Sequence, residues 1–424
     1  MHDPVRALVE QRPDFFAVRP AAAGQRAQRI ADGIYLSEGL SNAGMIVTPA
    51  GRIVINTGMG FEAPHHKAAF DAVCAGPTPW ILLTQGHVDH VGGVALFRES
   101  GTQLLAQRNN AACQRDDARI RGVRQAQAYI WFKAAIDAGT GTPGAPRAAY
   151  QQDTPVPDVL FDDSHRIELG GETIDLLATP GGETVDSCVV WLPARRILFS
   201  GNVFGPLFPH FPNVNTIRGD RYRFFEPYLD ALRRVRALEP ELLITGHFQP
   251  IAGAALIRAC LDRLEAAVEY VHTETLRGMN AGADIWTLMR ELRLPDALYV
   301  AQGYGKLSWA VRTIWESYMG WFKAQHTSEL YATRPREIYP DLVALAGKAA
   351  VLQRARARLD AGEPEAAGLL AEALLAANPG DRGALQLALE VHRALLARPD
   401  AAANFWEAGW LRHRIAALSA ALDN

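Results

Sequence analysis

The stretch from residue 80 to residue 93, Trp-Ile-Leu-Leu-Thr-Gln-Gly-His-Val-Asp-His-Val-Gly-Gly, constrains this chain more than any other feature. Its apolar beginning, Trp80 to Leu83, predicts a short buried strand that stops abruptly at a polar loop. Imidazoles and carboxylates at the end of such a strand are the groups that a borderline metal such as zinc selects. The alternative is a polar loop whose histidines are incidental. The metal-compatible side chains directly after the strand are Gln85, His87, Asp89 and His90.

Four further loops carry side chains that could bind a metal or an anion, and most of them follow a predicted strand. These side chains are Glu183, Asn202, Arg218 and His247. A single histidine is more often structural than a ligand, but His247 comes directly after the apolar run 242–245. Because the sites of α/β proteins lie at strand ends, His247 is also a candidate ligand.

The first loop resembles the signature of the metallo-β-lactamase superfamily, His-x-His-x-Asp-His followed by glycines, with Gln85 in the place of the first histidine. The resemblance implies the α/β fold of that superfamily, an αββα sandwich. Farther along the chain, apolar residues recur at helical spacing, which predicts an all-α region of tetratricopeptide-like helical hairpins. Within it, we expect residues 335–340 to be a break between helices, because a proline stands at each end.

Three segments are similar to the alkylsulfatase branch of the superfamily. The second loop, Pro-Gly-Gly-Glu at residues 180–183, has a carboxylate where most members have a histidine. The pattern Asn-x-x-Thr-x-Arg-Gly at residues 213–219 is similar to the segment that grips sulfate in that branch. Tyr-Met-Gly-Trp-Phe at residues 318–322, with the helices to about residue 418, resembles its dimerisation domain. The resemblance covers about residues 33–418, and we expect the sterol-carrier-like C-terminal domain to be absent, since the sequence ends at residue 424.

The resemblance also implies how the ligands are divided between two metal positions. One position would hold Asp89, His90 and His247, a complete three-ligand zinc set with one open position. The other would hold Gln85, His87 and Glu183, with Asn202 between the two metals. Gln85 is a poor zinc donor, and Asn202 replaces a bridging glutamate of the family, which removes a negative charge between two dications. We therefore expect one firmly held zinc ion and a second ion that is weak, absent or another metal such as iron or manganese.

These groups predict metal-assisted hydrolysis of an anionic ester with an apolar tail, because a metal ion lowers the pKa of its bound water towards about 7 and so prepares it for attack. Arg218 would anchor the anion, since its planar fork matches sulfate or carboxylate geometry. A surface ion pair is the alternative for Arg218. Asn213 and Thr216 are further candidates for substrate binding. Glu183 would be a metal ligand or a general base, so the catalytic candidates are Glu183, Asp89 and Arg218.

Two other functions fit the same residues. The fold could serve lactone or thioester hydrolysis, or a redox reaction at iron, because sites rich in carboxylates suit iron or manganese. Alternatively, the chain could be a metal-poor binding or scaffold protein whose helical region is the working surface.

Two features have two interpretations each, one of which places them at a substrate pocket. Residues 107–158 could form a lid or pocket wall, or a surface excursion without function. An aromatic group could line a pocket for an apolar tail, or belong to the core. Its members are Phe204, Phe208, Phe211, Tyr222, Phe224 and Phe225.

We predict three domains: an N-terminal leader packed on the surface (1–32), a metallo-β-lactamase-fold catalytic domain (33–278) and an all-helical dimerisation domain (279–424) that makes the protein a homodimer. A net charge of -3 argues against a general nucleic-acid partner. No apolar segment has the length needed to span a bilayer, and the N-terminus does not read as a secretory signal. Four widely spaced cysteines predict reduced thiols in a cytoplasmic protein.

Overall fold

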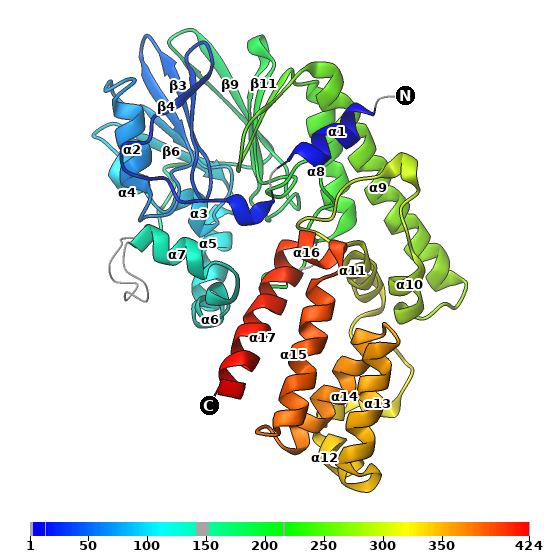
Figure 1. Cartoon of the computed structure of the whole chain (residues 1–424). Helices are drawn as coiled ribbons and strands as arrows, with labels where there is room; N and C mark the ends of the chain where they lie inside the picture. Colours follow the sequence, from blue (N-terminus) through cyan, green and yellow to red (C-terminus); the bar gives the residue numbers. More distant parts are fainter. Residues whose placement is uncertain (1–2, 13, 141–151, 215–216, 424) are drawn as a thin grey trace. The chain divides into compact units, whose positions relative to one another are not determined.

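The computed structural model describes residues 3–12, 14–140, 152–214 and 217–423. The chain forms two compact units, Met1–Ser317 and Tyr318–Asn424 (Figure 1). Thr216, one of the predicted substrate-binding residues, lies outside the described residues, as does the segment 141–151 of the predicted pocket wall.

The first sheet of the first unit has seven strands in chain order. They are β1 (Gln28–Ala31), β2 (Ile34–Ser37), β3 (Ala43–Thr48), β4 (Gly51–Ile55), β5 (Trp80–Leu82), β6 (Gln103–Gln107) and β7 (Val159–Phe161). The first four strands pair antiparallel, whereas β4 to β7 pair parallel. Parallel neighbours need crossover connections, and the helices α2 (Ala63–Asp71) and α4 (Val94–Phe97) lie in two of them.

The second sheet has six strands in the order β13-β12-β11-β10-β9-β8. Their bounds are β8 (Ser164–Leu169), β9 (Glu172–Ala178), β10 (Cys188–Leu192), β11 (Ile197–Gly201), β12 (Leu242–Thr245) and β13 (Ile251–Ala252). The one parallel pair, β11 with β12, is connected through helix α8 (Phe225–Leu238). The carboxyl ends of β11 and β12 therefore lie at the same edge of the sheet.

The side chains of β10 show how the layers form. Cys188, Val190 and Leu192 belong to the core between the two sheets, whereas Val189 and Trp191 face the core under helices α8 and α9 (Ala254–Asn280). Alternation along a strand sends successive side chains to opposite faces, so a strand that is apolar throughout must be covered on both. Helices α2 and α4 cover the outer face of the first sheet in the same way (Figure 1). The predicted αββα sandwich is confirmed.

The N-terminal segment is part of this core. Helix α1 (Pro4–Gln11) begins at Asp3, which caps the backbone N–H groups of Val5 and Arg6. Val5 and Val9 are buried in the cluster that contains α8 and α9. Residues 1–32, predicted as a leader on the surface, thus contribute buried side chains to the first unit.

Helices α10 (Ile285–Glu291) and α11 (Leu307–Met319) follow α9. Val300, Leu307, Val311 and Ile314 join the same cluster as α8 and α9, so the compact first unit extends to Ser317 rather than ending at residue 278. The predicted division into a catalytic domain (33–278) and a dimerisation domain (279–424) stays a prediction.

The second unit is built from helices, namely α12 (Pro335–Ala346), α13 (Lys348–Asp360), α14 (Pro364–Ala377), α15 (Arg382–Leu396), α16 (Pro399–Ala403) and α17 (Phe405–Asp423). Side chains of α12 to α15 and α17 share one apolar core. The turn at Gly362 has a positive φ of 78°, which glycine adopts without strain. The predicted break at 335–340 is wrong, because these residues lie in α12. Pro335 occupies the first turn, where a missing N–H costs nothing, and Pro340 is accommodated inside the helix.

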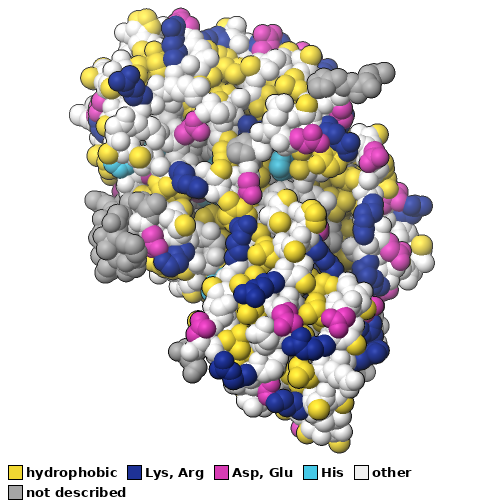
Figure 2. Space-filling view, in the orientation of Figure 1, with side chains coloured by type: hydrophobic (Ala, Val, Ile, Leu, Met, Phe, Trp, Pro, Cys, Tyr) yellow, Lys and Arg dark blue, Asp and Glu magenta, His cyan; other side chains and the backbone are white. Residues whose placement is uncertain are grey.

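Among the described residues, none of the helices is both long and apolar enough to cross a membrane. The four cysteines, all within the described ranges, form no disulfide. Acidic and basic side chains are interspersed on the face shown in Figure 2, in line with the small net charge of -3.

Candidate metal centre and substrate cavity

The loop after β5 is held by its neighbours at both ends. The backbone N–H of Thr84 donates to Asn56 Oδ1 at 3.0 Å, and the N–H of Thr57 donates to the His90 carbonyl at 2.8 Å. Between these points the one-turn helix α3 (Val88–Val91) turns Asp89 and His90 inward. A Cβ at Gly93 would clash with Ala63 of helix α2, so the close approach of that helix requires glycine.

Asp89, His90 and His247 come together at the ends of β5 and β12. Their nearest ligand atoms all lie within 4.8 Å of one another, and both histidines are buried. His247 Nδ1 donates to the Leu40 carbonyl at 2.6 Å, which leaves the Nε2 lone pair for the cluster. Burial alone would raise the pKa of the Asp89 carboxyl, but His90 and His247 outweigh it and hold the pKa at about 2. A carboxylate and two imidazoles in this arrangement fit a single divalent metal ion.

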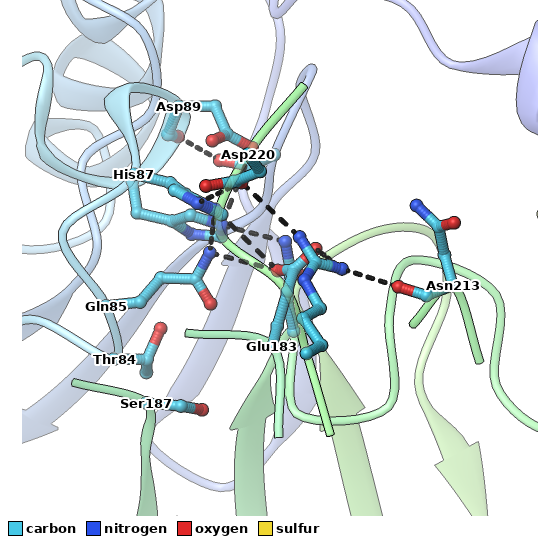
Figure 3. Close-up of polar contacts among 12 residues, drawn as sticks. Thr84, Gln85, His87, Asp89, Glu183, Ser187, Asn213 and Asp220 are labelled. Atoms are coloured by element: carbon cyan, nitrogen blue, oxygen red, sulfur yellow. Dashed lines mark hydrogen bonds and ion pairs between the residues drawn. The ribbon is translucent and has the colours of Figure 1, made fainter. Parts of the chain in front are cut away.

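The other three predicted ligands also meet, but they bond to one another. Gln85 Nε2 lies 2.9 Å from His87 Nδ1 and donates to Glu183 Oε2 at 3.1 Å. Figure 3 shows the Gln85 amide nitrogen directed toward His87 and Glu183, with the amide oxygen on the other side. A carboxylate can only accept, so the amide must present its nitrogen to Glu183, and an amide nitrogen has no lone pair for a metal. In this arrangement these residues do not fit a second metal ion.

Asn202 follows β11 and faces the same centre. Its Nδ2 lies 3.0 Å from His90 Nε2, and the residue is buried. Unlike the Gln85 amide, which a carboxylate orients, the Asn202 amide has an Oδ1 without a hydrogen-bond partner, so it can turn away from His90 when an ion binds. An amide at this position brings no negative charge, and the expected weakening of binding between two metal positions stays a prediction.

Two residues of this centre were missed by the sequence analysis, namely Asp220 and Arg223. His87 Nε2 lies 3.3 Å from Asp220 Oδ2, and Arg223 Nη1 lies 3.4 Å from Glu183 Oε1. Burial would lower the pKa of His87, but the hydrogen bond and charge of Asp220, together with the charges of Glu183 and Asp117, raise the pKa overall. Burial would raise the pKa of Glu183, but Arg223 and His87 lower it. Both residues follow Arg218-Gly219 in a short segment dense with charge, which usually indicates an exposed position, so the sequence carried no signal of their burial.

A cavity of about 420 Å³ opens beside the centre. Asp89 and His247 line it, together with Glu183 and Arg218. Arg218 Nη2 lies 3.6 Å from Asp220 Oδ2. Phe15 and Tyr304 also line the cavity, with their rings 4.9 Å apart in an edge-on contact. Phe15 meets the His247 ring edge-on at 5.5 Å as well, so the N-terminal segment covers a metal-ligand candidate.

One apolar wall of the cavity comes from the segment between β6 and β7. Its helices are α5 (Asn110–Arg119), α6 (Arg121–Trp131) and α7 (Lys133–Thr140). Apolar lining residues from it are Ala118, Ala128, Trp131, Phe132 and Ile136. Of the two interpretations of residues 107–158, the structure therefore supports a pocket wall.

The predicted aromatic group is placed elsewhere. Phe204, Phe208, Phe211 and Phe225 belong to the core under α8 and α9, whereas Tyr222 and Phe224 are exposed. None of the six is among the described residues that line the cavity. Asn213 does not line it either; the residue is buried, and its carbonyl accepts a hydrogen bond from Arg223 at 2.9 Å.

Comparison with protein families matches residues 36–247 to the metallo-beta-lactamase superfamily and residues 287–407 to the alkyl sulfatase dimerisation family. A linear primary-alkylsulfatase of Pseudomonas sp. is 28% identical over 327 residues, which are 72% of this chain and 60% of that protein. The alkyl/aryl-sulfatase BDS1 of Saccharomyces cerevisiae is 25% identical over 389 residues, 85% of this chain and 59% of that protein. The chain thus spans about 60% of the length of these relatives.

Among solved structures, the stereoselective inverting sec-alkylsulfatase Pisa1 from Pseudomonas sp. is similar with a TM-score of 0.79. The match is 21% identical and covers 94% of this chain and 65% of that one. At this identity the likeness shows that the two share a fold.

Proposed function

The chain belongs to the metallo-β-lactamase superfamily, and from this premise we propose that it is a metal-dependent hydrolase that cleaves an anionic ester with an apolar tail. It is a hydrolase that resembles alkylsulfatases, with a dimerisation domain of the alkylsulfatase type. Because the chain spans only part of the length of those relatives, the substrate class and the mechanism belong to this proposal.

The observation that carries the proposal is the composition of one cavity. Candidate metal ligands, an arginine and apolar helical side chains all line one cavity of about 420 Å³. Cavities of this volume hold small molecules, with a few polar groups to orient them and apolar surface to bury the rest. An ester that carries both a sulfate-like anion and an alkyl chain matches all three parts.

Asp89, His90 and His247 would hold the metal ion. When bound, a divalent ion supplies Lewis-acid catalysis and lowers the pKa of a coordinated water. The Leu40 carbonyl fixes the tautomer of His247 in advance. We propose zinc as the ion, with iron or manganese as the alternatives that metal analysis would distinguish.

Arg218 would bind the anionic group, because a guanidinium donates paired hydrogen bonds to sulfate oxygens and is always charged. Glu183 would accept a proton during hydrolysis. It lines the cavity, and the neighbouring Arg223 and His87 lower the pKa of its carboxyl, so it is ionised near neutral pH. The apolar side chains of α6 would bury the tail and exclude water.

We also propose that two copies associate through the region matched to the dimerisation family, residues 287–407. Size-exclusion chromatography with light scattering would measure the mass of the assembly against the 46.3 kDa of one chain. A mass of one chain at all concentrations would contradict this part of the proposal.

The experiment that tests the function is hydrolysis of dodecyl sulfate, followed by release of inorganic sulfate, with protein first stripped of metal and then given one equivalent of Zn²⁺. We expect activity only after metal is restored. Asp89→Asn should lose both bound metal and activity, whereas Asp116→Asn, at a residue of α5 that pairs with Arg221 and does not line the cavity, should keep both. Failure of the metal-loaded protein to hydrolyse alkyl sulfates of any chain length would reject the substrate class.

A further inference from the structure

The predicted second metal position is occupied by the amide group of Gln85. His87 Nδ1 and Glu183 Oε2 are 3.8 Å apart, and these two residues would hold a metal ion at this position. Gln85 Nε2 connects them instead, at 2.9 Å and 3.1 Å. An amide nitrogen has two N–H donors, enough to satisfy one lone pair on each partner. The lone pairs of His87 Nδ1 and Glu183 Oε2 that would hold an ion are therefore used within the protein, whereas Gln85 Oε1 points away from them and has no hydrogen-bond partner.

Arg223 supplies the positive charge at the same place. Its side chain is only 7% exposed, and Nη1 lies 3.4 Å from Glu183 Oε1. Nη1 also donates to the Asn213 carbonyl at 2.9 Å, and Nη2 lies 3.6 Å from Asp220 Oδ2. A buried carboxylate needs a cation or hydrogen bonds to be stable, and Glu183 receives both from protein side chains.

The surrounding charges are balanced without a dication. Besides Arg223, Asp220 faces Arg124 at 3.4 Å and Arg218 at 3.6 Å, and Arg124 also pairs with Asp117. Three arginines thus match the three carboxylates Glu183, Asp220 and Asp117. A second metal ion would add two positive charges where three arginines already face these carboxylates, with a fixed guanidinium as its neighbour.

We propose that Gln85 and Arg223 together replace the second metal ion of a dinuclear centre, the one at His87 and Glu183, so that this chain takes one ion only, at Asp89, His90 and His247. The inference rests on the proposed function, since it concerns the same centre. Gln85 links His87 and Glu183 through its amide nitrogen, and Arg223 supplies the positive charge beside Glu183. The enzyme then depends on a single ion, while the other half of the centre is built permanently into the fold.

The test is the number of Zn²⁺ ions bound by the full chain. Metal-free protein is titrated calorimetrically, and the bound zinc is counted by elemental analysis after gel filtration. We expect one equivalent for the wild type and one for Gln85→His, because Arg223 still excludes the second ion. The double variant Gln85→His with Arg223→Gln should bind two. Two equivalents of similar affinity in the wild type, or two in Gln85→His alone, would overturn the proposal.

The matched control is Gln85→His with Arg124→Gln. Arg124 faces Asp220 at 3.4 Å, as Arg223 does at a similar distance. Only Arg223 also contacts Glu183, so Arg124 tests whether that contact matters. This control should stay at one equivalent, and two would show that any loss of positive charge suffices, against a specific role of Arg223. The wild-type titration decides the question even where a variant does not fold. It is also independent of the hydrolysis assay: one bound ion without hydrolysis rejects the proposed function, whereas two bound ions with hydrolysis reject only this inference.

Discussion

His247 donates a hydrogen bond from Nδ1 to the backbone carbonyl of Leu40 at 2.6 Å, so a residue of the β2–β3 loop sets the orientation of a metal-ligand candidate at the end of β12. The loop is itself anchored by Glu62, a buried carboxylate at the start of α2. Glu62 accepts hydrogen bonds from the N–H groups of Leu40, Ala21 and Met59 at 2.9 to 3.0 Å. The geometry of the centre thus depends on a residue that does not touch it.

Glu62→Gln should weaken metal binding. The isosteric amide has one oxygen instead of two, so one backbone N–H would face an NH₂ group and the Leu40 loop would shift. Loss of a partner that touches a metal ligand costs roughly 10- to 100-fold in metal affinity, and because Glu62 acts on His247 only through Leu40, we expect a smaller loss. Competition for Zn²⁺ with a chromogenic chelator measures the change. Glu38→Gln, on the same loop with its carboxylate toward Gln249, is the control, and equal affinities for the two variants would contradict the prediction.

His210 should make the first unit less stable in acid. Burial lowers the pKa of its imidazole to about 4 from an ordinary value of 6.5. Between these values the unfolded chain binds a proton that the native protein does not, so the free energy of unfolding falls as the pH falls from 6.5 to 4. The full effect is about 3 kcal/mol, from 1.36 kcal/mol for each pH unit.

Denaturant titrations of the wild type and of His210→Leu at several pH values measure this effect. In His210→Leu, the free energy of unfolding should fall less steeply as the pH falls from 6.5 to 4. His413→Gln, at an exposed position of α17, should show the same pH dependence as the wild type. Parallel pH profiles for the wild type and His210→Leu would show that the histidine is not responsible.

The sequence was informative where an apolar run ends in polar side chains. Strand β5, its loop and the strand before His247 could be predicted, because continuous burial gives a strand a continuous apolar sequence. The αββα fold followed from them together with the family resemblance, and it is confirmed. The grouping of Asp89 with His247 required that resemblance, since two loops 158 positions apart in the sequence carry no sign of their contact.

Other parts of the site depend on packing that leaves no local pattern. Arg223 is a charged residue in a charged segment, which usually indicates an exposed position, and only the fold buries it against Glu183. Phe15 and Tyr304 reach the cavity from segments far apart in the chain. The aromatic group around Phe208 was equally compatible with pocket and core, because both environments favour the same residues.

Trp131→Ala should reduce the preference for long-chain substrates. Trp131 lines the cavity at the end of α6, and each buried methylene contributes about 0.8 kcal/mol, or about fourfold in binding. With a smaller apolar wall, kcat/KM should rise less steeply across a series of alkyl sulfates of increasing length. Val123→Ala is the control on the same helix, at a position that is 56% exposed. An unchanged dependence on chain length would place the tail elsewhere.

Arg218→Gln should raise KM for dodecyl sulfate. The guanidinium lines the cavity beside Asp89 and is the cation expected to contact the sulfate. A hydrogen bond to a charged group contributes roughly 1.5 to 3 kcal/mol, so KM should rise by about 10- to 100-fold. Arg221→Gln, an exposed arginine paired with Asp116, should leave KM unchanged. Added sulfate should also inhibit the wild type more strongly than Arg218→Gln, since the anion competes for the same guanidinium. Equal KM values and equal inhibition by sulfate would assign the anion to another cation of the cavity, such as Arg121.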